Sequence, residues 1–294
     1  MFRNLRLKKH PYKVEPSPGS LTARWLSEDA NVPATLKQLN ELPEGAKKRI
    51  YRALIPPVML TKFDINPISW EGSSDYQITL KAEPLQGEVY ISIGKMSDLC
   101  EEFFCLQLLD NAFNGIDLNF LIISDPSSLR FDIDRLADGS TTLFGTAGRN
   151  LETEEKAKKA GLAPGQVREG LALSRLVLNQ VEAFLVTCGH RAFFLEPLSY
   201  ASAWVFERRG FAYLRGHKLM EDIHKEFQPD GRLYQALDGS TPFRQPDQWC
   251  TVRGRAWAIH DGLLDAIEEK WDSLRMIKKL GYHAGVETFP DASY

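Results

Sequence analysis

The residues from Pro164 to Ser174 have the types and spacing of a loop that binds an anion where a helix begins. Gly170 and Ala172 carry little or no side chain at the start of the helical apolar pattern. The first-turn N–H groups can then point at an anion, and a diphosphate there gains hydrogen bonds and the favourable end of the helix dipole. Two small residues also permit close packing of a helix on a strand, so the loop alone leaves both interpretations open.

The elements after this loop alternate between helix and strand. The first predicted helix begins near Gly170, ends at Gly189 and has one apolar face, formed by Leu173, Leu176, Val177, Val181, Phe184 and Leu185. Arg191–Leu195 is a short apolar strand. Ser199 is a typical N-cap for the next helix, which ends at Gly210 before a further strand.

This stretch, about residues 164–214, resembles the GNAT acyltransferase superfamily, whose members use acyl groups carried on coenzyme A. The family loop has a Pro, then an Arg or Gln three positions on, then a Gly two positions before Gly or Ala. Pro164, Gly170 and Ala172 lie at matching spacing. The family's second signature is a helix that ends in Gly-Phe, and residues 203–211 match it in type and spacing.

The resemblance implies an α/β fold with a central mixed, mostly antiparallel sheet flanked by helices. It implies acetyl-CoA or another acyl-CoA as co-substrate, and an amine acceptor that is a small molecule or a peptide. The cofactor-binding residues that it implies are Arg168, Glu169, Gly170, Leu171, Ala172, Leu173, Ser174 and Ser199. Because the chain is weakly acidic, the positive potential for such an anion must be local, and we expect it at Arg168 and Arg175.

In a family-like mechanism an amine attacks the thioester, a base takes the amine proton and backbone amides polarise the carbonyl. Glu196 follows the strand 191–195 at the end where such sites open, which makes it the candidate base. Tyr200 is the candidate proton donor, with Tyr213 a second one. An exposed loop glutamate and tyrosines at the edges of elements are also common as structural residues.

Three positions depart from the family pattern. Val167 occupies the usual Arg or Gln position, although Gln166 and Arg168 flank it, and Ser199 replaces a common Asn. Phe206 stands where the family often has a Tyr as general acid, and Phe cannot donate a proton to a departing thiolate. The alternative function is therefore a catalytically inactive relative that binds an acyl-CoA, an acyl carrier or a protein.

Other chemistry-bearing residues have simpler interpretations. His190 follows Gly189 and can cap helix carbonyls, and Asp261 is a predicted N-cap for a helix that follows His260. Glu221 and His224 share a helix face, but one such pair is too few for a carboxylate metal centre, so we predict no metal.

The cysteines and the charge balance limit the compartment and the partners. The four cysteines, at positions 100, 105, 188 and 250, have no close CxxC pair, which favours reduced, mostly buried thiols in the cytoplasm. Lys plus Arg total 36 against 39 Asp plus Glu, a net charge of −3, which argues against broad nucleic-acid binding. The longest apolar runs, such as Phe120–Ile123, are too short to cross a bilayer, so we predict no membrane partner.

The remaining patterns divide the chain into three parts. Residues 1–60 form an extension, irregular to about 33 and then helical over Thr35–Leu42 and Pro43–Leu54. Residues 61–260 form the acyltransferase-like domain. Residues 261–294 carry a predicted helix over Gly262–Leu280, whose apolar face packs on the domain or pairs with a second copy as a homodimer.

Within the domain we expect a hairpin of Tyr76–Leu80 and Val89–Ile93, and a helix over 97–113. Further predicted elements are strands at Leu118–Ser124, Leu129–Asp134 and Thr141–Gly145, a charged, solvated helix at Glu152–Ala160, a helix at Lys218–Phe227 and a strand at Trp249–Ile259.

Overall fold

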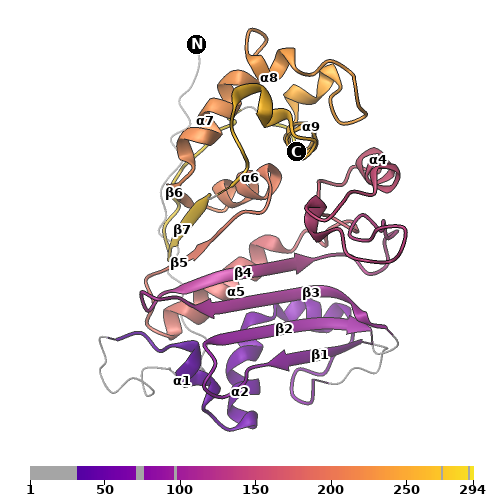
Figure 1. The fold of residues 1–294 in the computed structure, drawn as a ribbon. Coiled ribbons are helices and arrows are strands. Elements are labelled where there is room, and N and C mark those ends of the chain that lie inside the picture. Colours follow the sequence, from indigo (N-terminus) through magenta and orange to yellow (C-terminus); the bar gives the residue numbers. More distant parts are fainter. Residues whose placement is uncertain (1–31, 71–75, 96–97, 273, 291) are drawn as a thin grey trace, which may run out of the picture.

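The computed structural model describes residues 32–70, 76–95, 98–272, 274–290 and 292–294, and within them a seven-stranded mixed sheet flanked by helices (Figure 1). The strands are β1 (Tyr76–Lys81), β2 (Glu88–Lys95), β3 (Asp98–Asp110), β4 (Ile116–Ile123), β5 (Ala192–Leu195), β6 (Ala212–Arg215) and β7 (Arg275–Lys279). Their spatial order is β1-β2-β3-β4-β5-β7-β6. The expected α/β class and mixed sheet are confirmed.

β4 and β5 form the parallel pair of this otherwise antiparallel sheet, and they stay together only briefly. Their register covers Ile116 with Phe193 and Asp117 with Phe194. After Asp117 the pairing of β4 with β3 becomes irregular. Leu118 and Phe120 lie opposite two consecutive residues of β3, so Asn119 between them is an extra residue that forms a bulge. The two parallel strands therefore separate at the bulge, toward their carboxyl ends.

The hairpin of β1 and β2 is confirmed, but the helix expected over 97–113 is wrong. That segment is β3, which pairs with β2 and β4 along most of its length. The run is apolar on both faces because the central part of the strand is covered on both sides: Phe104 and Leu106 lie in the main core, and Cys105 between them is also buried. A continuous apolar run does not distinguish such a strand from a buried helix.

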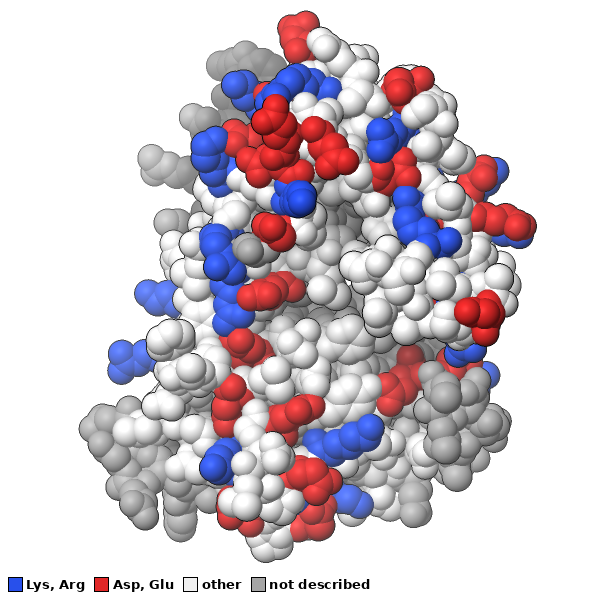
Figure 2. All heavy atoms as spheres, in the orientation of Figure 1, with Lys and Arg blue, Asp and Glu red and all other residues white. Residues whose placement is uncertain are grey.

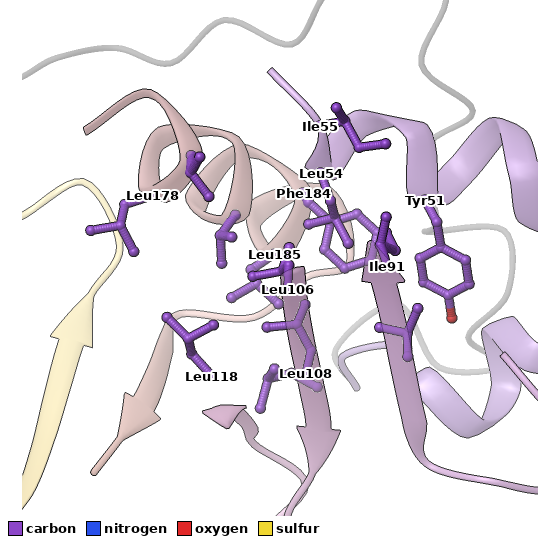
Figure 3. Close-up of a cluster of buried hydrophobic side chains, with 14 of the residues drawn as sticks. Tyr51, Leu54, Ile55, Ile91, Leu106, Leu108, Leu118, Leu178, Phe184 and Leu185 are labelled. Atoms are coloured by element: carbon purple, nitrogen blue, oxygen red, sulfur yellow. The ribbon is translucent and has the colours of Figure 1, made fainter. Parts of the chain in front are cut away.

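Helices α1 (Leu36–Asn40), α2 (Glu44–Tyr51), α3 (Pro57–Lys62) and α5 (Ser174–Thr187) cover one face of β1–β4 (Figure 1). A 3-10 turn, η2 (Arg52–Leu54), follows α2. Figure 3 shows how Tyr51 and Phe184 from these helices pack toward Ile91 and Leu106 of the sheet. The two N-terminal helices are as expected, and they belong to the main core. Most of the expected irregular segment, residues 1–31, lies outside the described residues.

The segment between β4 and α5 contains no regular strand in its described residues, which corrects the two strands expected at 129–134 and 141–145. Its isolated bridges join Arg135 with Thr141 and Ser124 with Gly170, and it has a 3-10 turn, η3 (Leu143–Gly145). Helix α4 (Leu151–Lys159) is confirmed, with Asn150 as its N-cap. Its charged surface is not wholly solvated, because Glu154 is buried. Residues 124–173 are called the insert below.

The C-terminal helices form a second core. They are α6 (Tyr200–Arg208), α7 (His217–Glu226), α8 (Arg232–Gln235), α9 (Val252–His260) and the 3-10 turns η4 (Pro246–Cys250) and η5 (Leu263–Ile267). The expected strand at 249–259 is wrong, since α9 occupies it. The expected helix at 262–280 is also wrong, because Gly262 and Glu268 adopt left-handed φ angles of 82° and 60° that bound a short turn.

β7 takes the place of the second half of that expected helix. It lies between β5 and β6, so the segment 261–294 contributes an inner strand of the sheet. Met276 and Lys278 point to a buried side and alternate with more exposed neighbours, as a strand requires. The apolar helix face on which we expected a homodimer therefore does not exist.

Candidate functional site

The loop from Arg168 to Leu173 lies against the carboxyl end of β4. Gly170 forms an antiparallel bridge with Ser124, and the Asp125 N–H donates to the Glu169 carbonyl at 2.7 Å. Helix α5 begins only at Ser174, four residues after the expected start. The delay has a backbone cause, since Ala172 is left-handed with a φ of 57°.

The N-terminus of α5 has no side-chain cap. Leu173 occupies the N-cap position and cannot accept a hydrogen bond, whereas α6 begins with Ser199 in a reciprocal capping box. The first-turn N–H groups of a 14-residue helix are thus available to a ligand or solvent. Ser199 is confirmed as an N-cap, and its hydroxyl accepts from the Ser202 N–H at 3.2 Å.

Two guanidinium groups gather at this uncapped end. Arg209, in the last turn of α6, donates from Nη2 to the Ser174 hydroxyl at 3.1 Å, and its Nε is buried with no hydrogen-bond partner. Burial, and then repulsion by Arg175, lower the pKa of Arg209. Within the described part of the chain neither arginine forms an ion pair with a carboxylate. Cations left together without an anion at a helix N-terminus make a site for one.

Arg168 does not contribute to this cluster, contrary to expectation. Its guanidinium turns toward β3, where Nε donates to Glu101 at 3.0 Å, and Nη1 donates to the Ser128 carbonyl. The Glu169 N–H also bonds to the Ser128 hydroxyl. Arg168 therefore holds the insert to the sheet. Leu171 and Leu173 are half-buried against the main core.

Sequence reasoning found Arg175 but missed Arg209, which looked like an ordinary last-turn cation. The two residues of its hydrogen bond, Arg209 and Ser174, lie 35 positions apart in the sequence. Only the packing of α6 beside α5 makes that bond possible.

Glu196 is exposed and lies close to the point where β4 and β5 separate. Its carboxylate pairs with Nη1 of Arg275 at 3.2 Å, and Nη2 of the same guanidinium lies 2.8 Å from both oxygens of Asp117. Asp117 is the last β4 residue paired with β5, and Glu196 comes two residues after its partner Phe194. Arg275 thus fixes one carboxylate on each of the separating strands.

The hydroxyls of Tyr200 and Tyr213 bond to residues other than this carboxylate pair, so no hydrogen bond joins Tyr200 to Glu196. Tyr200 is only 1% exposed, and its hydroxyl accepts from Arg255 at 3.4 Å within the second core. Tyr213 donates to Glu207 at 2.7 Å. Burial raises the pKa of both hydroxyls, and neighbouring Glu207 raises that of Tyr213 further. Both hydroxyls are therefore engaged with other residues and are weaker proton donors than an ordinary tyrosine.

Phe206, at the position where the family often has a tyrosine, is half-buried. Its ring packs edge-on against Phe211 at 5.1 Å, and Phe211 in turn packs on Phe193 of β5. The aromatic ring therefore has a structural role at the base of α6.

The histidines that the structure describes do not assemble a metal site. The His190 backbone N–H caps α5 as expected, donating to the Leu185 carbonyl at 2.9 Å, while its ring lies buried 3.0 Å from the Ala34 carbonyl, and burial lowers its pKa. Glu221 faces His217 at 3.8 Å, while His224 lies 3.3 Å from Arg255, so the two members of the expected pair have different partners. The described residues contain no group of three or more His, Cys, Asp or Glu side chains that could hold a metal ion.

We expected Asp261 to be the N-cap of a following helix, and this expectation is wrong. It ends α9 and accepts hydrogen bonds from Arg149 of the insert and from Thr241 and Arg244. Among the cysteines whose side chains are described, Cys105 and Cys188 are buried and Cys250 is exposed, and all three are free thiols.

Figure 2 shows one face of the molecule hollowed between the C-terminal helices and the part of the insert that carries α4. Uncharged side chains line much of the hollow, and charged ones gather around it. In the described ranges no helix combines the length and the apolar character needed to cross a membrane. Comparison with family models, with curated proteins and with solved structures found no match to this chain.

Proposed function

We propose that this chain is an acyl-CoA-dependent N-acyltransferase with a GNAT-like fold. The observation that carries the proposal is the separation of β4 from β5 beside the uncapped N-terminus of α5. Ligands of α/β sheets bind in crevices at the carboxyl ends of parallel strands. An opening there, next to a cluster of cations, suits a long ligand with an anionic end.

The anionic end is the coenzyme A diphosphate. Arg175 and Arg209 would bind its oxygens together with the first-turn N–H groups of α5, and the buried Nε of Arg209 would gain the acceptor that it lacks. A charged acceptor on such a donor contributes about 1.5–3 kcal/mol. Gly170 lies close to the strand, where an added Cβ would stand 3.4 Å from the Ile123 carbonyl oxygen, at the edge of ordinary van der Waals contact.

The acyl end would reach the bulge in β4. The extra residue at Asn119 disturbs the ladder, and a backbone N–H left there can polarise a thioester carbonyl. Glu196, held by Arg275, would take the proton of the attacking amine. The amine nitrogen bonds to the carbonyl carbon, the carbon–sulfur bond breaks, and solvent water protonates the departing thiolate because Phe206 has no hydroxyl.

The alternative function is a catalytically inactive, GNAT-like protein that binds an acyl-CoA, an acyl carrier or a protein. The specific observation in its favour is that Phe206 packs against Phe211 and that Tyr200 is buried, so that neither position offers an exposed hydroxyl to a departing thiolate.

Calorimetric titration with coenzyme A, acetyl-CoA and pantetheine tests the proposal. We expect saturable one-to-one binding of both coenzyme A ligands and, because pantetheine lacks the diphosphate, at least about tenfold weaker binding of pantetheine. Absence of heat with every coenzyme A ligand would contradict the proposal. Equal affinity for pantetheine would contradict the assignment of the diphosphate to α5.

Thiol release from acetyl-CoA and longer acyl-CoAs, in the presence of a panel of amines, separates the enzyme from its alternative. Turnover that falls at least about tenfold in Glu196→Gln supports the enzyme and its base. Tight binding without turnover of any amine supports the binding protein.

A further inference from the structure

A small cavity lies apart from the separated strands, between the insert and α9. Its volume is about 80 Å³, enough for two or three water molecules or one small organic group. Residues that line it are Asp134, Thr142, Phe144, Glu154, Trp257 and His260. The packing of the insert on α9 creates it, with Trp257 donating from Nε1 to the Leu162 carbonyl at 2.8 Å.

Two carboxylates line the cavity, and one oxygen of Asp134 has no donor among the protein groups. Asp134 binds Arg130 through Oδ2 at 2.8 Å, but its Oδ1 is buried with no donor. Glu154 is almost fully buried and accepts from Arg149 on Oε2, while its Oε1 lies 3.5 Å from His260 Nε2. A buried carboxylate oxygen without a donor is costly and calls for a ligand that supplies one.

Aromatic rings complete the wall. His260 stands edge-on to Phe144 at 5.3 Å and to Trp257 at 5.9 Å. Leu143, Phe144 and Gly145 have consecutive positive φ angles of 46°, 56° and 90°. Non-glycine residues held in this way are strained, and such strain clusters at ligand-binding segments. The strained turn holds the Phe144 ring at the cavity.

We propose that this cavity binds a primary alkylammonium group. Its N–H donors would satisfy Asp134 Oδ1, which has no donor, and would add a second donor to Glu154 Oε1 beside His260. Its first carbon would lie among the rings, which favour cations. An anion is opposed by the two carboxylates, and an apolar group leaves Asp134 Oδ1 unpaired. The volume admits methylammonium or the end of a longer amine.

An ammonium site of this kind would suit an acceptor with two amino groups. This step rests on the proposed function. The acceptor would be a diamine or a lysine-like molecule: the cavity would hold its unreactive ammonium group, while its second amine is acylated beside Glu196. The binding site itself does not depend on acyl transfer.

Nuclear magnetic resonance titration of the Trp257 indole N–H with methylammonium chloride tests the site. Sodium chloride at equal ionic strength is the salt control, tetramethylammonium is the cation without N–H donors, and Trp257→Phe assigns the signal. We expect a saturable shift with methylammonium alone. A response no larger than that to sodium chloride, which a cavity holding only water would give, overturns the proposal, as does an equal response to tetramethylammonium.

Asp134→Asn and Asp132→Asn form the matched pair. Asp132 also binds Arg130 but is exposed and outside the cavity. We expect methylammonium affinity to fall at least about tenfold in Asp134→Asn and to change less than about twofold in Asp132→Asn, with both proteins folded by circular dichroism. Equal affinities overturn the proposal. Coenzyme A affinity, measured on the same samples, should be the same in both variants as in wild type. If wild type does not bind coenzyme A, the proposed function is contradicted, but the proposed ammonium site is not.

Discussion

Replacement of Arg209 by Met should weaken coenzyme A binding without weakening the fold. Arg209 is held at the N-terminus of α5 by one hydrogen bond to Ser174, while its Nε is buried and unpartnered and Arg175 lies close enough to lower its pKa. Met keeps much of the aliphatic length and removes the charge. The variant therefore separates the role of the guanidinium in binding from the packing of its stem.

The two effects can be estimated separately. The loss of charged hydrogen bonds to the diphosphate costs about 1.5–3 kcal/mol, which corresponds to a 10- to 100-fold higher dissociation constant. In the free protein, the lost bond to the Ser174 hydroxyl costs about 1 kcal/mol, and relief of the buried, unpaired Nε returns about 1–3 kcal/mol. The ligand-free melting temperature should stay within about 2 °C of wild type or rise.

The assay is calorimetric titration with coenzyme A, combined with thermal unfolding with and without the ligand. Arg208→Met is the matched control, because Arg208 is the preceding residue, about half exposed, and pairs with Glu287 and the Trp204 ring instead. It should bind coenzyme A like wild type. A fall of several degrees in the ligand-free melting temperature of Arg209→Met, with coenzyme A affinity retained, would refute the reasoning and make Arg209 a structural residue.

Three further predictions concern stability. Burial alone would raise the pKa of Glu154, but its hydrogen bond to His260 and a neighbouring guanidinium hold the pKa below its ordinary value of 4.5. The resulting stabilisation is present above about pH 4.5 and is lost as the pH falls through the folded-state pKa. In urea unfolding from about pH 6 to about pH 3, wild type should therefore lose stability more steeply than Glu154→Gln. Glu207→Ala should lower the free energy of unfolding by about 3 kcal/mol in urea at neutral pH. The reason is that the fully buried carboxylate accepts the N–H and the hydroxyl of Thr288 and a tyrosine hydroxyl. A loss below about 1 kcal/mol would show that water replaces the carboxylate. Ala172→Gly should leave the unfolding free energy unchanged or raise it by up to about 1 kcal/mol, since glycine relieves the left-handed φ of 57°, and a clear loss would argue against strain at this position.

Local signals predicted the elements whose ends are set by individual residues. Ser199 caps a helix where expected, and Thr35 and Asn150 cap helices that begin within one residue of the expected starts, because these side chains accept backbone N–H groups within the same turn. Gly210 ends α6 with a φ of 85° for the same local reason. Such elements depend on contacts between residues close in sequence, which the sequence itself displays.

The errors fell on segments that pack through distant contacts. β3 pairs with strands on both sides, and β7 inserts between β5 and β6, although both sequences have apolar spacings that also fit a helix. The free energy that selects a strand at these positions comes from neighbouring strands, which no local pattern includes.

The candidate site divides in the same way. Ala172, Ser174 and Arg175 are recognisable in the sequence because the start of a helix is a local feature. Glu196 and Asp117 are brought together by Arg275, which is 158 positions from Asp117 in the sequence. Tyr200 was expected beside them, but α6 turns its first residue into the second core, where burial removes it from solvent.

The sequence by itself therefore determined the α/β class, several helix caps such as Ser199 and Gly210, and the approximate position of the loop before α5. Tertiary structure alone decided that β4 and β5 separate, that Arg209 rather than Arg168 joins Arg175, and that Asp134 and Glu154 face one cavity. The physical reason is that caps and turns are made by neighbours in the chain, whereas strand pairing, burial and the approach of like charges depend on residues that only the folded chain brings together.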